Sequence, residues 1–115
     1  MEVYNLKYLP PYLRSCLAQF RAGILPIEIE LGRYRNVPAE QRLCPLCTLG
    51  EPEDECHFVF RCEHFANLRT IMFNNTNIDT LDEVQALRTL MESYAKKLSI
   101  YICNALQKRK HTLYQ

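Results

Sequence analysis

The sequence predicts a small, mainly helical domain with one short extended segment. Apolar residues recur at helical spacing in several stretches of the chain, whereas one stretch alternates with a period of two. With 115 residues and 48% hydrophobic content, the chain is the size of one ordinary domain and can bury a modest core. We therefore expect residues 1–115 to form a single domain, with a core module over about 10–73 and a C-terminal helical part over about 79–110.

The first helix is expected directly after Pro10-Pro11 and is expected to end at Gly23. Its apolar face would hold Leu13, Cys16, Leu17 and Phe20. Cys16 is therefore expected to be a small core residue rather than a metal ligand or redox group.

The extended segment is expected between Ile27 and Leu31. Apolar residues alternate there with Glu28 and Glu30, which predicts a short strand or extended segment with one buried face. Gly32 would then turn the chain into a polar connector.

Later helices follow from apolar periodicity and from capping residues. We expect a helix start at Pro52–Glu55, a helix over 62–73, and a helix opened by a capping box from Thr80 to Glu83. The chain beyond that box would form either one long helix or two helices with a break near Ser93. Lys108–His111 would be a frayed basic C-terminus.

Four residues have the spacing of a metal site, Cys-x2-Cys-x9-His-x4-Cys: Cys44, Cys47, His57 and Cys62. Three thiolates and one imidazole form a closed tetrahedral set for Zn²⁺, and Pro45 would stiffen the tight turn between the first two cysteines. On an unbroken α-helix, residues five apart would point about 140° away from each other. The helix is therefore expected to break or unwind near Phe60-Arg61.

Other uses of the cysteines are less favoured. Six cysteines would suit a disulfide framework in a secreted chain, but the first residues lack a signal-peptide pattern, and a reducing compartment is expected. A Cys-x-x-Cys redox pair lacks its βαβ surroundings. Cys56 could compete as a ligand, and His64 is expected at the surface. Glu53, Asp54 or Glu55 could orient His57 through its free ring N–H.

The charge distribution restricts where nucleic acid could bind. The formal net charge is only +1, far from the strongly basic balance of typical nucleic-acid-binding domains. Residues 1–48 hold six Lys/Arg against four Asp/Glu, residues 49–95 three against nine, and residues 96–115 five against none. A phosphate-binding surface must therefore be local and come from the first third or the tail.

Two sets of arginines are candidates for contacts with phosphates or a stacked base. The first set lies in the polar connector and beside the first cysteine: Arg33, Arg35 and Arg42. The second set lies off the apolar face of the first helix: Arg14 and Arg21. The alternative interpretation is that these are ordinary solvated charges.

Catalytic motifs are missing from the sequence. The three glycines stand apart and form no phosphate loop, and no Ser/His/Asp set or pair of apposed carboxylates marks a catalytic centre. The His-x-Glu that a zinc deaminase places before its cysteine pair is also missing. We therefore expect no enzyme activity, no small-molecule substrate and, because no stretch approaches a membrane span, no membrane insertion.

Several blocks carry a resemblance in their order and spacing: Phe20-Arg21-Ala22-Gly23, Leu25-Pro26, Glu28-Ile29-Glu30-Leu31-Gly32-Arg33-Tyr34, Arg42-Leu43-Cys44-Pro45-Leu46-Cys47, Glu53-Asp54-Glu55-Cys56-His57-Phe58 and Arg61-Cys62. They resemble the C-terminal zinc-binding region of LINE-like, non-LTR retrotransposon reverse transcriptases. The resemblance covers residues 10–73 well and the later helices only by pattern. It implies zinc on the four residues named above, nucleic-acid binding, and an intracellular, nuclear location within a larger machine. The polymerase and its paired catalytic aspartates have no counterpart here, so no polymerase or endonuclease activity is inherited.

The combined expectation is a module stapled by one structural zinc ion that binds RNA or DNA. The alternative is a zinc-scaffolded protein–protein interaction domain, whose partner could be a reverse transcriptase or another protein. The near-zero net charge favours that alternative.

Overall fold

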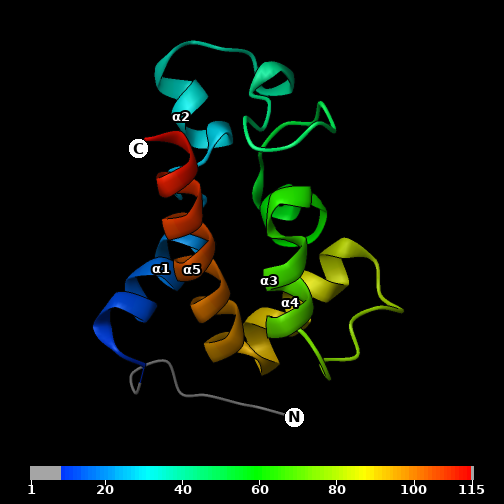
Figure 1. Ribbon diagram of the computed structural model, residues 1–115. Coiled ribbons are helices and arrows are strands. Elements are labelled where there is room, and N and C mark those ends of the chain that lie inside the picture. The colour runs from blue at the N-terminus through cyan, green and yellow to red at the C-terminus, as the bar shows by residue number, and fades with distance from the viewer. Residues whose placement is uncertain (1–8, 115) are drawn as a thin grey trace.

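The computed structural model describes residues 9–114, and they are mainly helical (Figure 1). The helices are α1 (Pro11–Ala22), α2 (Glu28–Tyr34), α3 (Ala66–Met72), α4 (Glu83–Ser93) and α5 (Ala95–Leu113), with a π-helix at His57–Arg61 and 3-10 turns at Ala39–Gln41 and Glu63–Phe65. The β structure within residues 9–114 is a single antiparallel bridge between Leu43 and Pro52. The mainly helical prediction is thus confirmed. Within this described part, no helix combines the length and apolar character that crossing a membrane requires.

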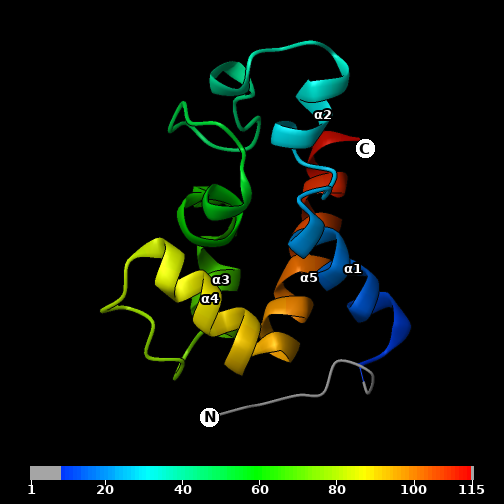
Figure 2. The same ribbon diagram turned by 180° about the vertical axis from the view of Figure 1, so that it is seen from behind.

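Helix α5 runs through the middle of the molecule. Figures 1 and 2 show α1 along one side of it, α3 and α4 along the other, and α2 beside its C-terminal end. The residues of α5 that face these neighbours are fully buried and recur at helical spacing: Leu98, Tyr101, Ile102 and Ala105. One hydrophobic core therefore includes side chains from both the predicted core module and the predicted C-terminal part.

An aromatic cluster joins the π-helix to α5. The ring centroid of Phe58 lies 5.2 Å from that of Phe65 and 6.1 Å from that of Tyr101, both in edge-to-face geometry. The Tyr101 hydroxyl donates a hydrogen bond to the carbonyl of Phe58, which satisfies its polar end inside the core. Burial raises the pKa of Tyr101, so the hydroxyl keeps the proton that this bond needs.

Helix α1 matches its prediction. Pro11 occupies the first turn, and Gly23 ends the helix in the left-handed conformation with φ 72°. Leu13, Leu17 and Phe20 are buried, and Cys16 packs against the same core. Burial and a hydrogen bond with Cys16 raise the pKa of Cys103 on α5 to about 12.

The predicted extended segment at Ile27–Leu31 is wrong, because α2 begins at Glu28. Ile27 and Leu31 are also four residues apart, so the short alternation fits one helical face as well as a strand. Two free backbone N–H groups at the start of α2 find acceptors on Glu53: Glu28 N–H donates to its carboxylate at 2.8 Å and Ile29 N–H to its carbonyl at 3.0 Å. This tertiary contact decides the conformation.

Two further predictions about helix ends are corrected. Asp82, and not Thr80, caps α4, since its carboxylate accepts the backbone N–H of Gln85. The Lys108–His111 tail is not frayed: α5 continues to Leu113, and the side chain of Arg109 is buried. Of the two arrangements considered beyond the capping box, the structure shows two helices, because α4 ends at Ser93 and α5 begins at Ala95.

Candidate metal centre

The side chains of Cys44, Cys47, His57 and Cys62 converge on one point. Their ligand atoms all lie within 4.8 Å of one another. His57 and Cys62 are fully buried, Cys44 is 7% exposed, and Cys47 is partly buried. The sequence therefore identified a group that the fold assembles and that could hold a metal ion.

The first two cysteines come from a loop whose ends are paired. Cys44 N–H donates to the carbonyl of Glu51 at 2.9 Å, and Glu53 N–H donates to the carbonyl of Arg42 at 2.9 Å. These bonds flank the Leu43–Pro52 bridge and fix the base of the loop between Arg42 and Glu53, which carries Cys47 and is called the metal loop below. The loop thus presents both thiols to the same side.

The π-helix brings His57 and Cys62 together. Cys62 N–H donates to the carbonyl of His57 at 2.8 Å, which is the five-residue bond that defines a π turn. This wide turn returns Cys62 to the face of His57, whereas an α-helix would place it elsewhere. Cys62 itself is extended, with ψ 121°, and ends the turn. The predicted unwinding before Cys62 is confirmed.

The helical start before His57 is shorter than predicted. Helical geometry begins at Glu55, not Pro52. Asp54 caps it: its carboxylate accepts His57 N–H at 2.8 Å, and its carbonyl accepts Phe58 N–H at 2.9 Å. The cap therefore positions the backbone of the histidine.

Two distances between donor atoms match those expected for tetrahedral zinc. Zinc–sulfur bonds of about 2.3 Å at tetrahedral angles place two sulfurs about 3.8 Å apart, and a zinc-bound sulfur and nitrogen about 3.5 Å apart. The Sγ atoms of Cys44 and Cys62 are 3.8 Å apart, and Sγ of Cys47 is 3.4 Å from Nε2 of His57. Three soft thiolates and an imidazole are also the donor set that Zn²⁺ accepts. The residues present therefore fit the ion.

Glu51 orients the imidazole of His57. Its Oε1 lies 2.9 Å from Nδ1, so Nδ1–H donates to the carboxylate and the lone pair of Nε2 faces the cysteines. Arg61 Nη1, 3.3 Å from the same oxygen, holds the carboxylate from the other side. Glu51 lies in a loop whose sequence has no periodicity. Only its position between the ligands in the sequence could have indicated that it contacts His57.

Glu53, Asp54 and Glu55 were considered as possible partners of the His57 ring N–H, but the structure gives that contact to Glu51. Asp54 is the helix cap, and one carboxylate oxygen of Glu55 is buried without a partner in the described chain. Burial raises the pKa of Glu55. Glu53 pairs instead with Arg109 of α5.

Glu53 and Arg109 form a buried ion pair between the metal loop and α5. The carboxylate of Glu53 is 0% exposed and accepts bonds from Nε and Nη2 of Arg109 at 2.9 and 2.8 Å. Only 4% of the Arg109 side chain is exposed, and its Nη2 also lies 3.6 Å from Glu28. The pair with Glu53 raises the pKa of Arg109 against the opposing effect of burial. Sequence reasoning missed Arg109 because three other basic or titratable residues surround it.

The thiols of Cys44 and Cys62 also interact with each other. A hydrogen bond between them raises the pKa of Cys44 and lowers that of Cys62, and desolvation by burial raises both. Either sulfur could be the donor at 3.8 Å, and the two pKa shifts favour a proton on Cys44. Metal binding must displace such protons, because the thiolate is the ligand.

Cys56 and His64 lie outside the converging group. Burial raises the pKa of Cys56, which favours its neutral thiol. His64 lies 3.0 Å from the hydroxyl of Thr112 on α5, and its carbonyl accepts a bond from Lys108. Neither residue competes for the site in this conformation.

The candidate arginines divide into three places. Arg14 and Arg21 are exposed and line the same shallow depression on α1. Arg33 and Arg35 are more than half exposed but pair with Glu30 and Glu28 at 2.7 and 2.9 Å.

Arg42 is partly buried, and its Nε and Nη1 donate to the carbonyls of Val37 and Ile29, both at 2.8 Å. Its stem also fills the space next to Gly32, where an added Cβ would lie 2.6 Å from its Cγ. Arg42 therefore holds α2 and the metal loop together.

The four donors can chelate an ion and so link the loop that carries Cys44 and Cys47 to the π turn that carries His57 and Cys62. Comparisons with protein-family models, with curated proteins and with solved structures found no match for this chain.

Proposed function

We propose that this chain is a nucleic-acid-binding module, held in shape by one zinc ion and without catalytic activity of its own. The observation that carries the metal part is the convergence of Cys44, Cys47, His57 and Cys62 at zinc-like spacing. The same four residues occupy the ligand positions of the resemblance to the zinc-binding region of non-LTR retrotransposon reverse transcriptases.

The zinc we propose is structural. Protein atoms supply all four donors, so a tetrahedral ion would have no open position for a water or a substrate. Three of the donors belong to buried residues, and the fourth, Cys47, is partly buried. Site formation of this kind contributes on the order of 10 kcal/mol to folding, comparable to the whole stability of a small domain.

The nucleic-acid part rests on the resemblance and on the exposed arginines. Arg14 and Arg21 share one face of α1 and have free access to solvent. Arg33 and Arg35 are exposed enough to exchange their glutamate partners for phosphates. The resemblance also supports an intracellular, nuclear location and a place beside a polymerase.

A protein-interaction module is the second candidate, and two observations favour it. Arg33 and Arg35 already have acidic partners within the chain. Three thiolates add −3 and a zinc ion adds +2, which brings the formal net charge from +1 to zero. In that case the zinc builds a scaffold, and the partner could be a reverse transcriptase.

Metal analysis and a salt series test the proposal together. We expect one zinc per chain, and binding of labelled single-stranded RNA or duplex DNA that weakens steeply as salt rises. For single strands, each lost phosphate contact lowers the slope of log K against log salt by about 0.7. Two double variants are compared, Arg14→Ala/Arg21→Ala and Arg33→Ala/Arg35→Ala.

Arg88→Ala is the control for the loss of an exposed arginine, because Arg88 is exposed on α4 and belongs to neither set. The nucleic-acid proposal fails if no strand or duplex binds at low salt. It also fails if neither double variant changes the slope more than the control does.

A further inference from the structure

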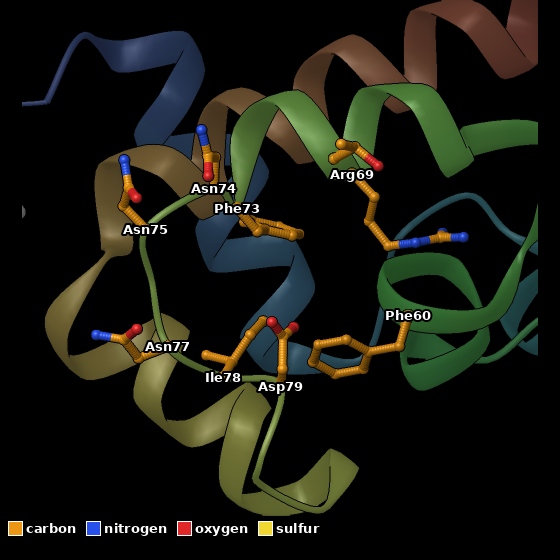
Figure 3. Close-up of a pocket in the computed structure, with 9 residues that line it drawn as sticks. Phe60, Arg69, Phe73, Asn74, Asn75, Asn77, Ile78 and Asp79 are labelled. Atoms are coloured by element: carbon orange, nitrogen blue, oxygen red, sulfur yellow. The ribbon is translucent and has the colours of Figure 1, made fainter.

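A pocket of about 590 Å³ opens between the π-helix, the end of α3 and the loop that follows it. It lies apart from the metal ligands, none of which lines it. Its volume falls within the range of small-molecule sites, about 300–1,000 Å³. Figure 3 shows the side chains that form it.

Two aromatic rings form its walls. The rings of Phe60 and Phe73 point into the same space from opposite elements, and Ile78 lies below Phe73, on the other side of Asp79 from Phe60 (Figure 3). Phe73 is held from behind by Tyr101, whose ring centroid lies 5.0 Å from its own. Phe73 therefore offers a flat apolar surface that is supported from the core, and Phe60 adds a second ring at the pocket.

A carboxylate stands between the rings. The side chain of Asp79 points up into the space that Phe60 and Phe73 border (Figure 3). Asp79 is exposed at the pocket, so its oxygens can accept hydrogen bonds from a ligand without a large burial cost. An aromatic ligand with N–H donors on its edge could stack on the two rings and donate hydrogen bonds to the carboxylate.

Amide side chains surround the mouth. Asn74, Asn75 and Asn77 line the pocket, and all three are exposed. Asn75 and Asn77 have φ 65° and 56°, so the loop bends sharply twice around the opening. Lys97 reaches this loop, with Nζ 3.5 Å from the carbonyl of Asn74, and brings positive charge close to the mouth.

We propose that this pocket binds one unpaired nucleobase that carries an exocyclic amino group. The base would lie against Phe60 and Phe73, and its amino group would donate to Asp79, as carboxylates accept from cytosine N4. The asparagine amides are suited to the remaining base edges, and the sugar and phosphate would leave through the mouth towards Lys97. This inference rests on the proposed nucleic-acid-binding function. Within that function, the pocket would give a preference for single strands.

Free nucleosides test the pocket independently of oligonucleotide binding. Adenosine, cytidine and uridine are titrated into zinc-loaded protein, and the side-chain amide signals of Asn74, Asn75 and Asn77 are followed by NMR. We expect adenosine and cytidine to shift these signals, with about tenfold weaker binding of uridine, which has no exocyclic amino group. N-acetyltyrosinamide is the control for simple stacking.

Two variants test the named roles. Phe60→Leu keeps an apolar residue but removes the ring, and should weaken nucleoside binding about 5- to 150-fold. Asp79→Asn keeps the shape but adds a donor, and should abolish the preference for cytidine over uridine. Glu92→Gln, an exposed charge removal on α4, should change neither. Zinc content and helical circular dichroism confirm that each variant is folded.

Any of three results would overturn the proposed nucleobase binding. The first is that no nucleoside shifts the amide signals at millimolar concentration, and the second is that N-acetyltyrosinamide shifts them as much as the nucleosides do. The third result is that folded Asp79→Asn retains the preference for cytidine over uridine. Oligonucleotides that bind with a normal salt slope while nucleosides fail would reject the pocket and leave the proposed function standing. Nucleosides that bind while oligonucleotides fail would reject that function and support the pocket alone.

Discussion

Removing one partner of the Glu53–Arg109 pair should be among the most damaging single changes outside the metal ligands. In Arg109→Met the stem remains, but two hydrogen bonds of 2.9 and 2.8 Å disappear. The carboxylate of Glu53, which is 0% exposed, would keep only the backbone N–H of Glu28 as a close donor among the bonds described. Leaving a buried charge without its partner costs about 3–5 kcal/mol.

The measurement is urea unfolding of zinc-loaded protein, followed by circular dichroism. A loss of about 3–5 kcal/mol is a large share of the roughly 5–15 kcal/mol that stabilises a typical domain. Glu53→Gln should also destabilise, since it leaves the guanidinium of Arg109 with only the more distant carboxylate of Glu28, 3.6 Å from Nη2. The double variant should cost less than the sum of the single variants by about 2 kcal/mol, because no uncompensated charge remains.

Lys110→Met is the matched control, because Lys110 is the next residue on α5 and is exposed. Its effect should stay within about 0.5 kcal/mol. The reasoning is refuted if Arg109→Met and Lys110→Met have equal effects. Additive single and double variants would likewise show that the two side chains do not stabilise each other.

The remaining predictions concern the metal centre and its supports. Excess chelator, or Cys47→Ser, should lower the helical circular dichroism and the melting temperature sharply, and unchanged melting would contradict a structural zinc. Glu51→Gln should weaken zinc affinity about 10- to 100-fold in a competition assay because His57 loses its orienting carboxylate, whereas Glu92→Gln, an exposed residue on α4, should not. Gly32→Ala should cost about 1–3 kcal/mol because its Cβ meets the stem of Arg42. That cost should fall in an Arg42→Ala background, and an equal cost in both would locate the strain elsewhere.

The metal group could be predicted because its signal is local. Ligand spacing along the chain identified Cys44, Cys47, His57 and Cys62, and the mismatch between α-helical geometry and a five-residue spacing predicted the unwinding before Cys62. Helical periodicity also predicted α1, but it left open whether one long helix or two helices with a break near Ser93 would follow the capping box. Such patterns depend on residues close together in the chain.

What could not be predicted depends on contacts between distant residues. The conformation of α2 is decided by Glu53, 25 residues away, which accepts its first N–H groups. The burial of Arg109 could not be predicted from its basic neighbours in the sequence, because it depends on a carboxylate 56 residues earlier. The role of Glu51 depends on the folding of an irregular loop. No periodicity in the sequence records these pairings.

The buried pair also sets where the chain can be shortened. A fragment that ends after α3 would contain every metal ligand but would lack Tyr101, which packs against Phe58 and Phe65, and Arg109, which neutralises Glu53. Its exposed core and unpaired carboxylate would lie directly beside the metal loop. The shortest piece expected to load metal into a native site therefore extends to the last turn of α5.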